Sequence, residues 1–195
     1  MRKSFVFMDC WMNFLCNGKV GFEMDRGEIA KGYFLKGYNC SQAIVLAFSD
    51  RTGLDEHTGA KLASSFGGGM GRMREVCGAF SGMLIVLGML YGYDASAETE
   101  TANKKLHYER VQALAERFRT EFGSIICREL LAGKAREEMK KGADADGEQV
   151  KAMLSDSADP TPRTEAYYKK RPCPEIVENG ARILEKFMAE LEENH

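Results

Sequence analysis

The sequence lacks the features that mark several classes of protein. It has no run of about 18 apolar residues, the length that crosses a bilayer as a helix. Its 27 Lys and Arg residues do not outnumber its 29 Asp and Glu residues, so it has no basic excess for a nucleic-acid backbone. Only four of its 195 residues are proline and 44% are hydrophobic, which excludes a disordered or fibrous chain. These absences predict a globular protein with its own core, which binds neither membrane nor nucleic acid.

Several short motifs are also missing. Without Cys-x-x-Cys the chain has no thioredoxin-like or simple zinc-ribbon motif, and without Cys-x-x-Cys-His it has no c-type haem attachment site. The glycine-rich segment 67–71 lacks the Gly-Lys-Ser/Thr of a P-loop, and Arg72 stands where Gly-x-Gly-x-x-Gly needs its third glycine. We therefore expect neither haem nor nucleotide as cofactor. Asp9 interrupts the apolar stretch near the N-terminus, so no secretory signal is expected and we predict a cytoplasmic protein.

Apolar periodicity and capping residues predict an all-α fold, a compact bundle of about six helices. Asp25, Asn39 and Asp55 are the expected N-caps. The segment 75–90 is apolar on most sides, which predicts a central buried helix, and Gly78 and Gly82 would give that helix a groove for close packing. The expected helices cover residues 26–35, 39–50, 55–66, 75–90, 95–121, 124–131 and 174–191.

Composition divides the chain into unequal parts. Residues 1–24, which carry Cys10 and Cys16, precede the regular helical pattern and are predicted to be a poorly ordered leader. Residues 25–195 are predicted to form a single four-cysteine helical domain. Within that domain, residues 133–171 are polar and charged, which predicts a loop or insertion with one helix near 148–154.

Four of the six cysteines, Cys40, Cys77, Cys127 and Cys173, fall near predicted helix starts. Unpaired backbone N–H groups and the helix dipole stabilise an anion there, so they lower the pKa of a thiol and favour a thiolate. Four converging thiolates could hold an iron–sulfur cluster or a tetrahedral metal, whereas converging pairs could cycle between dithiol and disulfide. For any one cysteine, a small buried core residue is an equally good interpretation.

The glycine-rich segment precedes Cys77 and could bring its backbone close to these sulfurs, with its amides as hydrogen-bond donors. Arg72 and Arg74 could add positive charge, unless they are solvated or paired with a neighbouring acid such as Glu75. The candidate cofactor-binding residues are therefore Gly67, Gly68, Gly69, Gly71, Arg72 and Gly78.

Three motifs, Asn39-Cys40-Ser41-Gln42-Ala43, Phe66-Gly67-Gly68-Gly69-Met70-Gly71-Arg72 and Cys77-Gly78-Ala79-Phe80-Ser81-Gly82, occur together with Cys127 and Cys173. In this combination the chain resembles the redox-active protein family C_GCAxxG_C_C. It departs from the family in the order of cysteine and glycine in the third motif, in the leader, and in the long segment 133–171. The resemblance implies redox activity, and the attachment of similar domains to multihaem cytochromes implies electron transfer.

We therefore expect a redox protein whose four cysteines bind an iron–sulfur cluster or another metal for electron transfer or redox sensing. One alternative is a metal-free thiol–disulfide oxidoreductase. Another is a non-catalytic helical protein that binds a partner and has inert cysteines. The sequence leaves open whether the protein is an enzyme. A redox partner protein is expected, and a homodimer is possible.

Overall fold

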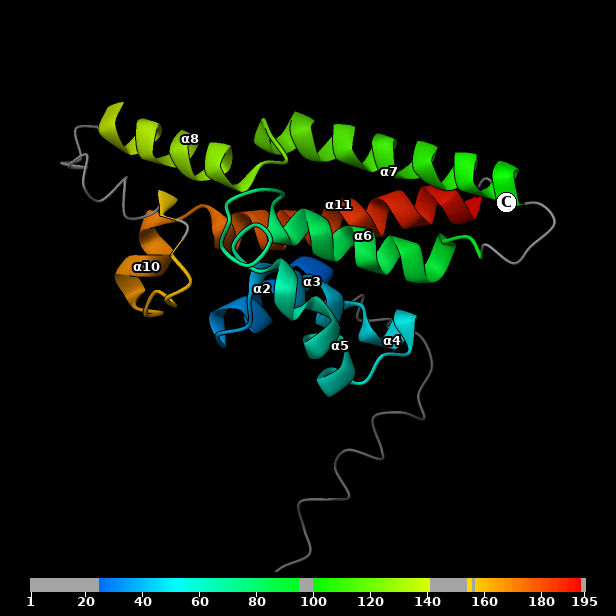
Figure 1. The fold of residues 1–195 in the computed structure, drawn as a ribbon, viewed down its shortest axis with the longest axis horizontal. Coiled ribbons are helices and arrows are strands. Elements are labelled where there is room, and N and C mark those ends of the chain that lie inside the picture. The colour runs from blue at the N-terminus through cyan, green and yellow to red at the C-terminus, as the bar shows by residue number, and fades with distance from the viewer. Residues whose placement is uncertain (1–24, 95–99, 141–153, 156, 194–195) are drawn as a thin grey trace, which may run out of the picture.

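The computed structural model describes residues 25–94, 100–140, 154–155 and 157–193 (Figure 1). The predicted leader at 1–24 lies outside this part of the chain, as does all but Leu154 of the helix expected near 148–154. The helices are α2 (Arg26–Leu35), α3 (Cys40–Ala47), α4 (Ser49–Thr52), α5 (Glu56–Ala63), the 3-10 turn η1 (Ser64–Phe66), α6 (Gly78–Tyr91), α7 (Glu100–Phe122), α8 (Cys127–Lys140), α10 (Glu165–Lys170) and α11 (Cys173–Glu193).

The predicted all-α class is confirmed. Within the described residues the only β-pairing is an isolated bridge between Val76 and Ile126. None of the described helices is long and apolar enough to cross a membrane. The helices pack around one hydrophobic core, whose largest fully buried side chains include Phe34, Ile44, Phe48, Met83, Leu87 and Phe118.

Helix α6 lies in the middle of this packing, with α3 on one side and α7 and α11 on the other (Figure 1). The expected glycine groove is confirmed, because a Cβ atom on Gly82 would lie 2.8 Å from the Ser41 carbonyl oxygen and 2.9 Å from the Ile44 Cβ. The predicted burial holds for the first part of α6, whereas Met89 near its end is 44% exposed. The absence of side chains on the glycines thus lets α3 and α6 approach closely near their first turns.

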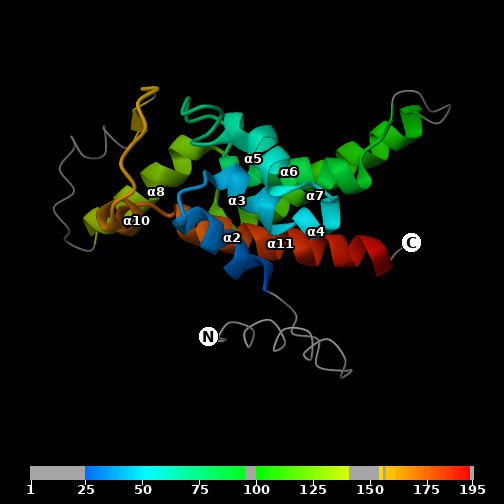
Figure 2. The ribbon, with the colours of Figure 1, turned by 90° about the horizontal axis from the view of Figure 1, so that it is seen from below.

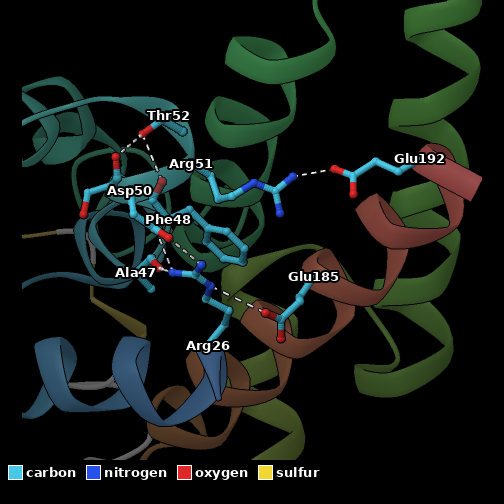
Figure 3. Close-up of polar contacts among 9 residues, drawn as sticks. Arg26, Ala47, Phe48, Asp50, Arg51, Thr52, Glu185 and Glu192 are labelled. Atoms are coloured by element: carbon cyan, nitrogen blue, oxygen red, sulfur yellow. Dashed lines mark hydrogen bonds and ion pairs between the residues drawn. The ribbon is translucent and has the colours of Figure 1, made fainter. Parts of the chain in front are cut away.

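Polar contacts join α2, α3, α4 and α11 at the ends of α3 and α11 that lie away from the cysteines (Figure 3). The Arg26 guanidinium donates to the Ala47 carbonyl oxygen at 2.8 Å and to both Asp50 carboxylate oxygens at 2.7 Å. The same guanidinium also pairs with Glu185 of α11, and Arg51 of α4 pairs with Glu192. These contacts fix the direction of α3 and α11 and thereby the positions of their first residues.

Three predicted boundaries are wrong. The helix expected over 39–50 is divided at Phe48, and the helix expected to begin at Glu75 begins at Gly78, because residues 75–77 are extended and pair with 125–127. The segment 133–171 is only partly a loop. Helix α8 continues to Lys140, and α10 forms where the Thr164 hydroxyl caps it by accepting from the Tyr167 amide at 3.2 Å.

Candidate four-cysteine site

Each of the four cysteines begins a helix. Cys40, Cys127 and Cys173 are the first residues of α3, α8 and α11, and Cys77 is the N-cap of α6. The predicted position near helix starts is therefore confirmed. The start of α3 is fixed by a capping box, in which the Asn39 side chain accepts from the amides of Ser41 and Gln42 at 3.0 Å.

A short antiparallel pairing brings Cys77 and Cys127 to the same place. The Cys77 amide donates to the Ile125 carbonyl oxygen at 2.8 Å, and the Cys127 amide donates to the Glu75 carbonyl oxygen at 2.6 Å. An ion pair between Glu75 and Arg128 flanks this pairing. The start of α6 is thereby bonded to the start of α8, although 50 residues separate the two cysteines in the sequence.

The glycine-rich segment forms a left-handed turn against the cysteines. Its five consecutive residues from Gly68 to Arg72 all have positive φ, between 57° and 74°. Glycine adopts this conformation freely, whereas each non-glycine residue there costs about 1–3 kcal/mol. A Cβ on Gly69 would lie 2.6 Å from the Cys127 Cβ, and one on Gly78 would lie 3.2 Å from the Cys40 Cβ. The missing side chains thus allow the backbone to approach the cysteines.

All four cysteines line one pocket, a cavity of about 40 Å³. Helix α11 begins with Cys173 at its end beside α10, opposite to the end of α11 that leads to the C-terminus in Figure 2. Of the six candidate cofactor-binding residues, Gly68, Gly69 and Gly78 also line it. The others are absent from the lining within the described part of the chain. Gly67 lies against the Asn39 side chain, and Arg72 donates to the Ser157 carbonyl oxygen and the Thr161 hydroxyl.

Burial is the largest influence on the pKa of two of the four thiols, Cys77 and Cys127. Desolvation raises the pKa of Cys77 to about 12 and that of Cys127 to about 11. The nearby Arg74 charge lowers the pKa of Cys127, but by less than burial raises it. Both groups are therefore neutral thiols near pH 7.

Cys40 and Cys173 interact with each other, and their pKa values shift in opposite directions. Hydrogen bonding to Cys173 is the largest cause that raises the pKa of Cys40, and burial adds to it. Hydrogen bonding from Cys40 lowers the pKa of Cys173, against desolvation, and the charges of Arg171, Arg163 and Arg74 lower it further. The expectation that helix starts lower every thiol pKa is thus wrong for three cysteines, because burial and neighbouring sulfurs outweigh the helix start.

Sequence reasoning missed part of the pocket wall. Arg163, Tyr167 and Arg171 line the pocket, yet all three belong to the segment interpreted as a polar loop or insertion. Arg171 is only 5% exposed and stacks on the Tyr167 ring at 4.7 Å, while Arg163 lies 4.7 Å from the centre of the Phe34 ring. The available signal was the spacing of arginine and tyrosine just before Cys173, which suits cation–π packing.

The four sulfurs share the pocket without forming a ready-made metal site. Among the described residues, no group of three or more Cys, His, Asp or Glu side chains is arranged so that it could hold a metal ion. A metal or cluster would therefore need the cysteine side chains to rearrange.

One comparison with known proteins identifies a family. The family described as "Putative redox-active protein (C_GCAxxG_C_C)" matches residues 38–187, which include all four cysteines of the pocket. The chain belongs to this family. The C_GCAxxG_C_C match also spans α10, so the arginines and the tyrosine of the pocket wall lie within it. No curated protein and no solved structure matches the chain.

Proposed function

We propose that the protein transfers electrons by reversible oxidation of Cys40 and Cys173 to a disulfide, in a reducing compartment. The observation that carries this proposal is the direct interaction of the two thiols, with one pKa lowered and the other raised. A lowered pKa supplies a thiolate that attacks, and an adjacent thiol supplies the second sulfur.

The co-reactant is a disulfide of a partner protein. The Cys173 thiolate attacks one partner sulfur, the partner S–S bond breaks, and the released sulfur leaves as a thiolate that takes up a proton. The negative charge on Cys173 is then consumed in the mixed disulfide, so one cause of the high Cys40 pKa disappears. Cys40 loses its proton and its thiolate attacks the Cys173 sulfur, so the S–S bond between Cys173 and the partner breaks and the second partner sulfur leaves as a thiolate that takes up a proton. The internal disulfide forms, and the partner leaves as a dithiol with two electrons gained.

A redox titration of the full chain tests this proposal. The reduced protein is equilibrated with glutathione buffers of stepped potential, alkylated and mapped by peptide mass spectrometry. We expect a two-electron transition in which Cys40 and Cys173 disappear together as free thiols. The double variant Cys77→Ser/Cys127→Ser should keep this transition. A transition in which both thiols stay free, or one that links Cys173 to another cysteine, would contradict the proposal.

The second candidate function is electron transfer or sensing by an iron–sulfur cluster or another thiolate-bound metal. Four cysteines at four helix starts around one pocket favour it, since Cys₄ sets bind such centres. The test is anaerobic purification, followed by metal analysis and a visible spectrum before and after reconstitution with iron and sulfide. A cluster predicts stoichiometric iron and charge-transfer absorption that any of the four Cys→Ser variants reduces. A colourless, metal-free protein after reconstitution would exclude this candidate.

A further inference from the structure

The pocket that holds the cysteines carries an excess of positive charge. Three arginines, Arg74, Arg163 and Arg171, line it, and the described lining residues include no Asp or Glu. Arg74 and Arg171 are 4% and 5% exposed, so their charges are largely removed from water. A buried charge is costly unless a partner compensates it.

Arg74 shows most directly that a partner is missing. Its Nε donates to the Ser155 carbonyl oxygen at 3.0 Å and its Nη1 to the Gly68 carbonyl oxygen at 3.3 Å. Its Nη2 is buried and has no hydrogen-bond partner in the described structure. The two N–H groups of Nη2 thus have no acceptor next to the cavity that Arg74 lines, where the same guanidinium also acts on the Cys127 sulfur. The two carbonyl oxygens accept hydrogen bonds from the guanidinium, but they are uncharged and do not balance its positive charge.

The rest of the pocket lining supplies no fixed negative charge to balance the three guanidinium groups. Apart from the arginines, the described lining consists of the four cysteines, three glycines, Asn39, Tyr167 and the apolar residues Leu130, Leu131, Pro172 and Ile176. The excess of positive charge also acts on the neighbouring Arg72, whose pKa is lowered by burial and by the charges of Arg74 and Arg171.

We propose that this pocket binds a small oxyanion, held by the free Nη2 donor of Arg74 with Arg163 and Arg171 beside it. Guanidinium N–H groups form short charge-assisted hydrogen bonds to the oxygens of an oxyanion, and three guanidinium groups around one cavity supply the positive charge that such an ion needs. The cavity of about 40 Å³ has room for an inorganic ion of a few atoms and excludes a nucleotide. The bound oxyanion lies among the four cysteines, within reach of the thiol chemistry of the site.

Equilibrium dialysis of the reduced full chain with labelled sulfate, at ionic strength fixed with sodium chloride, tests the site. We expect saturable binding of one sulfate per chain, with a dissociation constant of roughly millimolar or tighter. Arg74→Gln should weaken binding on the order of tenfold, the size of one charge-assisted hydrogen bond. Arg119→Gln removes the same charge from an exposed ion pair with Glu116 and should leave binding unchanged.

A second readout does not depend on whether the Arg74 variant folds. In the unaltered protein, saturating sulfate should slow the alkylation of Cys173 by iodoacetamide relative to chloride at the same ionic strength. The sulfate concentration that gives half of this effect should equal the dissociation constant measured by dialysis. Uptake that never saturates, or sulfate binding that a folded Arg74→Gln variant retains in full, would overturn the proposal. The dithiol proposal is judged separately, because dialysis reads anion binding whether or not Cys40 and Cys173 form a disulfide.

Discussion

The four cysteines begin helices in the same way, yet they form two chemically different pairs. Cys77 and Cys127, the buried pair, lie on two segments that backbone hydrogen bonds join, and burial raises their pKa values to about 12 and about 11. Cys40 and Cys173, the interacting pair, are half-buried, and a hydrogen bond between their thiols shifts the pKa values of both. Position at a helix start therefore does not determine reactivity. Burial raises the pKa of all four thiols, and what separates the pairs is the hydrogen bond between Cys40 and Cys173 together with the arginine charges that act on Cys173.

The largest effect that separates the pairs is expected from single Cys→Ser variants incubated with a partner disulfide. Cys40→Ser keeps Cys173 with the arginine charges that lower its pKa and with a hydroxyl in place of the Cys40 donor, but it lacks the second sulfur, so it should accumulate a mixed disulfide at Cys173. Cys173→Ser should accumulate none. Non-reducing electrophoresis followed by peptide mapping checks this difference. Cys127→Ser serves as the control and should turn over as the unaltered protein does. Equal trapping by Cys40→Ser and Cys173→Ser would erase the distinction between the pairs.

The pH dependence of alkylation sharpens the same distinction. A thiol of pKa about 12 is thiolate to only about one part in 10⁴ at pH 8, and this fraction rises tenfold with each pH unit. Cys173, with its lowered pKa, should react with iodoacetamide at the lowest pH of the four, and Cys127 and Cys77 should react only as the pH approaches 11 and 12. Site-resolved mass spectrometry measures the four rates. A common pH profile would show that the hydrogen bond from Cys40 and the arginine charges do not set Cys173 apart from the other three thiols.

The sequence predicted the starts of α2, α3 and α11 because each depends on local chemistry. Asp25 and Asn39 cap α2 and α3 as expected, and the start of α11 follows from Pro174. It did not predict the two-residue pairing of Val76 with Ile126, since so short a bridge leaves no periodic pattern. The extended residues 75–77 that this bridge requires shift the start of α6 to Gly78.

The pocket wall was missed for a different reason. Helix α10 has only six residues, and Arg163 and Arg171 pack on aromatic rings of their own segment and of α2. Such packing depends on the tertiary fold, and neither composition nor periodicity reports it. The pKa of Cys173 is lowered first by the hydrogen bond from Cys40 and then by the charges of these arginines, so the difference between the two pairs could not be predicted from the thiols and their helix positions alone.

The missing side chain of Gly78 lets the start of α6 lie close to Cys40 of the interacting pair. The variant Gly78→Ala should disturb this close packing. The new Cβ would lie 2.7 Å from the Phe66 carbonyl oxygen and 3.2 Å from the Cys40 Cβ. Because backbone must move, we expect a loss of about 1–3 kcal/mol in the free energy of unfolding, measured by urea denaturation. In Gly88→Ala, on the same helix, the new Cβ would have no atom within 4 Å. This variant should instead raise the free energy of unfolding by up to about 1 kcal/mol. Equal effects of the two variants would show that close packing at Gly78 is not limiting.

The smallest effect is expected at the cap of α3. Asn39→Ala removes the acceptor for two amides and the donor to the Ser64 carbonyl oxygen, and should cost about 1 kcal/mol of stability. Asp55→Ala removes the matching cap of α5, a helix without cysteine, and should cost a similar amount. Only Asn39→Ala should also shift the midpoint potential of the Cys40–Cys173 couple, since Asn39 sets the position of the first residue of α3. If Asp55→Ala shifts that potential equally, general loosening of the fold, rather than the placement of Cys40, controls the interacting pair.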